Sequence, residues 1–165
     1  MKKATTAESN KGLIAELVFL LNKGNAHAGF EDAVHDMKED LLGKKPHGVP
    51  YSLWQLVEHV RITQADILEF CVNPAYKEMN WPDDYWPKEA APANMKAFHD
   101  TVKQVEKDRK AFIELLESEE ADLYEPLAHG TGQNLLREAL LIADHTAYHT
   151  GEIILLRRML GDWKA

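Results

Sequence analysis

The sequence predicts an all-α protein, and three observations support this fold class. Four long segments place apolar residues at helical spacing, and no stretch alternates convincingly between apolar and polar residues. The segments are separated by loops that contain Gly and Pro, and these loops differ in length, which favours a four-helix bundle. The length of 165 residues fits a single domain, 1–165, without internal repeats.

The first half of the chain carries clear signals for where helices begin and end. One long helix is expected over residues 10–23, because Gly24 follows it as a stop signal. A shorter helical piece is expected around residues 30–37, and the Gly- and Pro-containing residues 43–50 predict a loop. The second long helix is expected to begin after Ser52, which fits a capping box with Gln55, and to end near residue 72.

A long loop rich in aromatic residues is predicted between the second and third long helices. Residues 73–91 contain three prolines together with Tyr76, Trp81, Tyr85 and Trp86. Structureless connections longer than ~12–15 residues are uncommon and often form lids or binding loops. The loop therefore either covers a site and excludes water or caps the end of the bundle. The third helix is expected over residues 93–117 and the fourth over residues 133–160.

Composition and charge exclude several classes of protein. The chain has 19 Lys and Arg against 27 Asp and Glu, and this net charge of −8 disfavours binding to nucleic acid. The longest apolar runs are far shorter than the ~20 residues of a spanning helix, so we expect no contact with a membrane. With one cysteine, Cys71, and no recognisable signal peptide, the sequence predicts a cytoplasmic protein.

Three of the eight histidines stand out. His145 and His149 are four residues apart in the fourth helix, so both rings project from one largely apolar face. His59 lies in the middle of the second helix, on a polar stripe within an otherwise apolar segment. Together they could form a three-nitrogen site with open positions for water or substrate, as in a catalytic metal site. Alternatively, the pair satisfies its own hydrogen bonds and His59 binds a carboxylate.

Two stretches of the chain resemble signatures of the DinB-like superfamily. Residues 50–59 resemble its second-helix signature, and residues 143–153, followed by Leu156, Arg157, Arg158 and Gly161, resemble its fourth-helix signature; residues 24–31 add to the likeness. The resemblance implies an antiparallel four-helix bundle, usually dimeric, with a divalent metal ion held by three histidines. Its members include metal-dependent hydrolases of the YfiT type and transferases that use low-molecular-weight thiols such as bacillithiol or mycothiol.

Carried over to this sequence, the implied metal ligands are His59, His145 and His149. Imidazole ligands suit Zn²⁺ or Ni²⁺. Glu152 departs from the family, which often has Gln at that position, and is a candidate fourth ligand, a hydrogen-bond partner of a ligand, or a proton acceptor. Asp66, on the His59 face of its helix, is a second candidate proton acceptor.

These observations favour a metal-dependent enzyme, either a hydrolase or a low-molecular-weight-thiol S-transferase, that acts on a small-molecule substrate. The alternative is a non-catalytic, metal-stabilised dimeric binding module. The fourth helix is apolar nearly all round, whereas a helix in a single bundle should show one polar face. We therefore expect a homodimer formed through this helix. The residues opposite its histidines are Leu136, Leu140, Ala143, Ala147 and Ile154.

Overall fold

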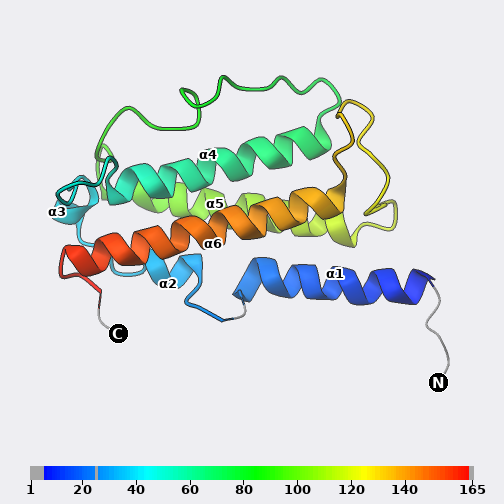
Figure 1. Cartoon of the computed structure of the whole chain (residues 1–165), viewed down its shortest axis with the longest axis horizontal. Helices are drawn as coiled ribbons and strands as arrows, with labels where there is room; N and C mark the ends of the chain where they lie inside the picture. Colours follow the sequence, from blue (N-terminus) through cyan, green and yellow to red (C-terminus); the bar gives the residue numbers. More distant parts are fainter. Residues whose placement is uncertain (1–5, 25, 164–165) are drawn as a thin grey trace.

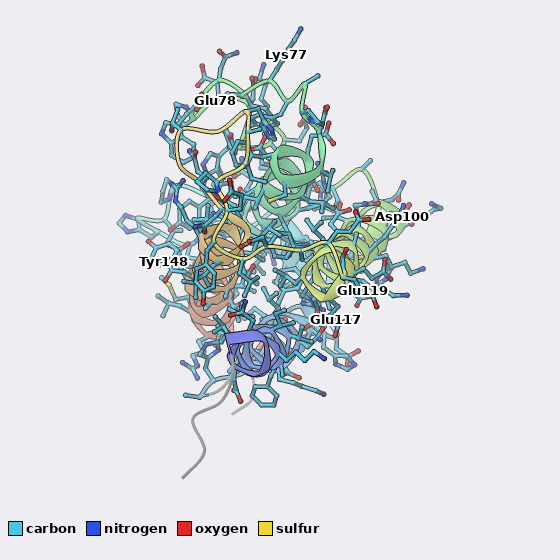
Figure 2. The ribbon with its side chains drawn as sticks, turned by 90° about the vertical axis from the view of Figure 1, so that its right-hand side faces the viewer. Lys77, Glu78, Asp100, Glu117, Glu119 and Tyr148 are labelled. Atoms are coloured by element: carbon cyan, nitrogen blue, oxygen red, sulfur yellow. The ribbon has the colours of Figure 1, made fainter. Side chains whose placement is uncertain are left out.

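The structure, a computed structural model, describes residues 6–24 and 26–163, and within these ranges all regular structure is helical. The long helices α1 (Thr6–Lys23), α4 (Leu53–Val72), α5 (Met95–Glu117) and α6 (Leu135–Met159) lie side by side, and Figure 2 views them nearly end-on. Two short helices, α2 (Phe30–Val34) and α3 (Glu39–Leu42), precede α4. The all-α prediction is confirmed. In the part of the chain that is described, no helix combines the length and apolarity needed to cross a membrane.

Capping side chains explain where the helices begin. The predicted capping box is present: the Ser52 hydroxyl accepts from the Gln55 backbone N–H, and the Gln55 side chain accepts from the Ser52 N–H, both at 3.2 Å. Asn94 and Asn134 cap α5 and α6, which therefore begin at residues 95 and 135 rather than at 93 and 133. The short helix expected around residues 30–37 ends at residue 34, before Asp36 with its left-handed φ of 52°.

The directions of the long helices differ from the antiparallel order that the family resemblance implies. The course of colours in Figure 1 shows that α4 and α5 run in the same direction, while α6 runs opposite to both. The connection between α4 and α5 must therefore return along α4, a helix of 20 residues and about 30 Å. This requirement explains the length of residues 73–94, which we call the aromatic loop.

The histidine-bearing part of α6 lies between two apolar clusters. One cluster includes Ile153 and Leu156 of α6 together with buried residues of α2 to α5. The other includes Ala139 and Ile142 of α6 together with buried residues of α1, α4 and α5. Because both clusters join α6 to α4, they fix these helices against each other on both sides of His145 and His149. The N-terminal helix α1 covers one end of α6, and α2 covers the other (Figure 1).

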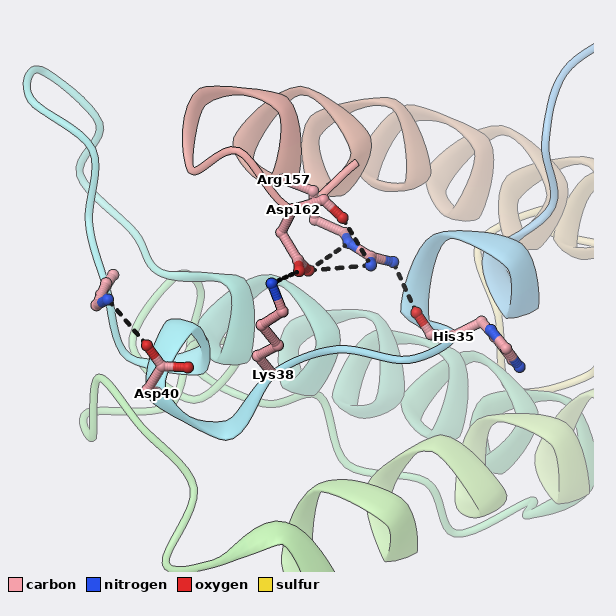
Figure 3. A network of polar contacts seen from close by, with 6 residues as sticks. His35, Lys38, Asp40, Arg157 and Asp162 are labelled. Carbon is pink, nitrogen blue, oxygen red and sulfur yellow. Dashed lines mark hydrogen bonds and ion pairs between the residues drawn. The ribbon is translucent and has the colours of Figure 1, made fainter. Parts of the chain in front are cut away.

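A buried cation ties the end of α6 to the chain that follows α2. The Arg157 guanidinium donates to the carbonyl oxygens of Ala33 at 2.8 Å and His35 at 2.9 Å. It also pairs with the Asp162 carboxylate at 3.0 Å, and Figure 3 shows its contacts with His35 and Asp162. Lys38 reaches the same carboxylate at 3.3 Å. The side chains of Arg157 and Asp162 are only 6% and 5% exposed, so this pair is held out of water.

We expect Arg157→Met to lower the free energy of unfolding by about 3–5 kcal/mol, because it removes one partner of a buried ion pair and the donor to two carbonyl groups. The matched control is Arg158→Met at the exposed neighbouring position, which should change the free energy by no more than about 0.5 kcal/mol. Urea unfolding followed by circular dichroism measures both. Similar losses in the two variants would contradict this account of Arg157.

Candidate metal centre

The structure brings the three sequence-predicted histidines together. His59 comes from α4, and His145 and His149 come from successive turns of α6. One ring nitrogen of each lies within 4.8 Å of those of the other two. His59 and His149 are buried, at 2% and 6% exposure, and His145 is partly buried. His59 lies on the second turn of α4, and His145 and His149 lie near the middle of α6; these residues, so distant in sequence, meet because α4 packs against α6.

The orientation of His59 is set by the aromatic loop. Its Nδ1 lies 2.7 Å from the backbone carbonyl oxygen of Tyr85, so Nδ1–H donates and Nε2 keeps its lone pair. The Trp86 ring stacks on the imidazole, with centroids 3.9 Å apart and planes 6° apart. Sequence reasoning missed the supporting roles of Tyr85 and Trp86. The available signal was an aromatic-rich loop too long to be a simple connection.

Glu152 supports His149 in a similar way. The Nδ1–H of His149 donates to Glu152 Oε2 at 2.7 Å, and the Tyr51 hydroxyl donates to Glu152 Oε1. Burial and the hydrogen bond to Glu152 raise the pKa of Tyr51 to about 12, so its hydroxyl stays protonated at neutral pH. Both carboxylate oxygens are thus occupied by donors, and His149 Nε2 is left with its lone pair.

The position of His145 fits a shared ion. Its Nε2 lies 3.1 Å from His59 Nε2. Metal–nitrogen bonds of ~2.0–2.1 Å place two neighbouring ligand nitrogens about 2.9–3.4 Å apart, depending on the coordination geometry. Burial lowers the pKa of all three imidazoles, and that of His145 to about 3 with additional repulsion from the other two rings. Neutral imidazoles are the form that binds metal, so these residues fit a divalent ion.

Asp66 is on the same helix as His59, α4, but it is not part of the histidine group. Its carboxylate accepts hydrogen bonds from the hydroxyls of Tyr76 at 2.9 Å and Tyr85 at 2.8 Å. It does not line the pocket that contains the histidines, but it lines a neighbouring cleft. Because the Tyr85 carbonyl holds His59, Asp66 is connected to the site through the aromatic loop.

The pocket at the histidines is walled by aromatic rings. Its volume is about 440 Å³, and within the described chain no lysine or arginine lines it. Trp81 and Tyr148 are 70% and 64% exposed, and Figure 2 shows Tyr148 projecting from α6 at the outer side of the bundle. Any positive charge in this pocket at neutral pH would therefore come from a bound ion. The lining residues are Tyr51, His59, Trp81, Trp86, Leu141, Asp144, His145, Tyr148, His149 and Glu152.

Cys71 is not part of this site. It is buried on α4, in the apolar cluster at the other end of the helix. Burial, with a smaller contribution from Glu138, raises the pKa of its thiol to about 12. The thiol is therefore fully protonated at neutral pH, and protonated buried thiols are poor nucleophiles.

Fold and site together define an all-helical protein with a histidine group close enough to hold a metal ion. A family model described as the DinB superfamily matches residues 25–153, a range that contains all three histidines. The chain belongs to the DinB superfamily, and the resemblance seen in its sequence is confirmed. No curated protein and no solved structure matches it.

We expect Glu152→Gln to weaken the affinity for Zn²⁺ by roughly 10–100-fold, because a neutral amide supports the His149 imidazole less well than a carboxylate does. Competition with a chromophoric chelator measures this affinity. Asp144→Asn is the matched control, since Asp144 lines the same pocket, is exposed, and forms no hydrogen bond or ion pair with the three rings in the described structure. Equal affinities of the wild type and Glu152→Gln would contradict the supporting role of Glu152.

Proposed function

We propose that this protein is a metal-dependent enzyme in which His59, His145 and His149 hold a divalent ion, either Zn²⁺ or Ni²⁺. One observation carries the proposal: the Nδ1 atoms of His59 and His149 are both engaged by hydrogen-bond acceptors, so their Nε2 atoms are the available ligands. Ligating histidines in metal sites are oriented in this manner. Three protein ligands leave coordination positions open, as catalytic sites do.

The residues around the ligands have separable tasks in this proposal. A bound ion would lower the pKa of a coordinated water toward ~7 or stabilise a thiolate. Glu152 orients His149, and each of its oxygens accepts one hydrogen bond, so a second lone pair on each oxygen is left to accept a proton. Asp66 acts at a distance by holding the Tyr85 side chain. Trp86 covers one face of His59 and limits the access of water.

Two candidate reactions fit this site. Hydrolysis requires only water beside a polarised substrate, and S-transfer requires a low-molecular-weight thiol supplied from outside, because the Cys71 thiol is buried and protonated. The aromatic walls favour a small molecule with an apolar portion. We propose either a hydrolase or a thiol S-transferase.

We expect tag-free protein to contain close to one equivalent of Zn or Ni, and His145→Ala to contain little, because the variant loses one of three ligands. Mass spectrometry of the purified proteins measures metal content. His99→Ala is the matched control, since His99 is exposed on α5 and lies outside the histidine group.

Absence of metal from the native protein, and no uptake of added Zn²⁺ or Ni²⁺, would overturn the proposal. Bound metal without an exchangeable water would instead favour the non-catalytic binding module, because a closed coordination shell is typical of a structural site. With metal and exchangeable water established, screening for ester or amide hydrolysis and for thiol transfer would separate the two enzymatic assignments.

The homodimer remains a proposal, with a different contact surface from the one expected. Leu136 and Ala143 pack against the cluster that includes residues of α1, and Ile154 is buried beside α2. Another stripe of α6, which shares only Leu140 with the expected surface, is exposed, and we propose that a second copy of the chain covers it. The exposed apolar residues of this stripe are Leu140, Leu141, Tyr148, Leu155 and Met159.

We expect sedimentation velocity at micromolar concentration to show a species of twice the monomer mass of 18.8 kDa. Leu155→Arg should shift the protein towards the monomer, because it places a charge within the apolar stripe, while its exposed position spares the fold. A single 18.8 kDa species of the native protein would contradict the proposal.

A further inference from the structure

A second cleft adjoins the histidine pocket and is not used by the proposed metal centre. It has a volume of about 580 Å³, and Leu141 lines both cavities. Its walls come from α4, α6, the aromatic loop and the segment between α5 and α6; Figure 2 shows labelled Glu78 beside that segment. The lining residues are Asp66, Ile67, Phe70, Tyr76, Glu78, Tyr85, His129, Gly130, Thr131, Gln133, Arg137, Glu138 and Leu141.

Glu138 is a buried carboxylate in this cleft that has no hydrogen-bond donor close to it in the described structure. It is 3% exposed, yet its carboxylate accepts no hydrogen bond from any described residue. Its cationic neighbour is Arg137, whose guanidinium is 3.6 Å away and whose side chain is 58% exposed. Burial disfavours the charged form of this carboxylate and raises the pKa of Glu138. A ligand that donates hydrogen bonds would offset this cost of burial.

The other charges of the cleft also favour a cation. Asp66 and Glu78 join Glu138, so three carboxylates face one guanidinium within the described lining. The oxygens of Asp66 each accept a hydrogen bond from a tyrosine hydroxyl, whereas the carboxylate of Glu138 accepts none from the described residues.

Aromatic rings form the apolar part of the same cleft. Phe70 stands edge to face with Tyr76, at a centroid distance of 5.2 Å, and with His129, at 5.1 Å. The His129 imidazole donates from Nε2 to the Phe70 carbonyl oxygen at 2.7 Å, which fixes this wall. Aromatic faces attract cations and also bind apolar bodies.

We propose that this cleft binds a primary ammonium group attached to an aromatic or alkyl body, with the ammonium at Glu138 and the apolar body against Phe70 and Tyr76. Such a ligand supplies a close donor to Glu138 and adds positive charge to a lining that holds three carboxylates and one guanidinium. Insofar as the inference concerns the substrate, it rests on the proposed function. Glu138 precedes His145 by seven residues of α6, a rise of about 10 Å, so the substrate would carry its ammonium about that far from the reacting group.

The test uses 2-phenylethylamine as the probe and 2-phenylethanol as its neutral counterpart. Calorimetric titration of the full chain should show that the amine binds roughly tenfold or more tightly than the alcohol, and that Glu138→Gln removes this preference. Glu117→Gln makes the same change in net charge at an exposed site at the end of α5 and should leave it intact (Figure 2). Equal binding of both probes, or an unchanged preference in Glu138→Gln, would overturn the proposal.

Two further measurements keep the test decisive. Nuclear Overhauser effects from the probe to the rings of Phe70 and Tyr76 locate it without any variant, and contacts confined to the histidine pocket would overturn the site. Binding of the amine should also persist in His145→Ala, because none of the lining residues is a proposed metal ligand. A protein that holds metal but ignores the amine refutes only the cleft, and a metal-free protein that binds the amine refutes only the enzyme.

Discussion

The contact between α4 and α6 is the constraint on which the rest of this structure depends. The two helices run in opposite directions and are joined by an apolar cluster on each side of the turn that carries His145 and His149. The clusters leave little freedom for α6 to slide or rotate, since interiors are close-packed. Three imidazoles are thereby held together and kept neutral, although bringing polar rings into such an interior opposes folding. The hydrogen bonds to Tyr85 and Glu152 offset part of that cost.

Whether a feature could be predicted from the sequence depends on how far apart in the chain the residues that determine it lie. Helical spacing is local, so four long helices and the shared face of His145 and His149 were accessible from the chain alone. The capping box at Ser52 was likewise a local signal. The partner of His59 is a backbone carbonyl of Tyr85, and no side-chain pattern marks a carbonyl that lies 26 residues away. The parallel course of α4 and α5 was also beyond the sequence, because a long loop is compatible with either direction.

Burial on α6 shows a second limit. The sequence shows that this helix is apolar nearly all round, but not which stripe the neighbouring helices cover. In the structure α1 and α2 cover the side opposite the histidines, whereas Leu155 and Tyr148 remain exposed. Asp66 illustrates the same point, since its helical face suggested a place beside His59. Asp66 lies about two helical turns after His59, and its carboxylate there accepts hydrogen bonds from the hydroxyls of Tyr76 and Tyr85.

The aromatic loop has a consequence for how this architecture can diversify. The proposed ligands stand on helices whose other faces form the core, so substitutions near them disturb packing. Two residues of the pocket wall, Trp81 and Trp86, are instead carried by the aromatic loop, and Trp81 is 70% exposed. Loops of this kind tolerate substitution and insertion more readily than helices do. Substitutions in the loop can therefore change which molecules the pocket accepts without changing the three histidines, provided that the Tyr85 carbonyl group stays beside His59.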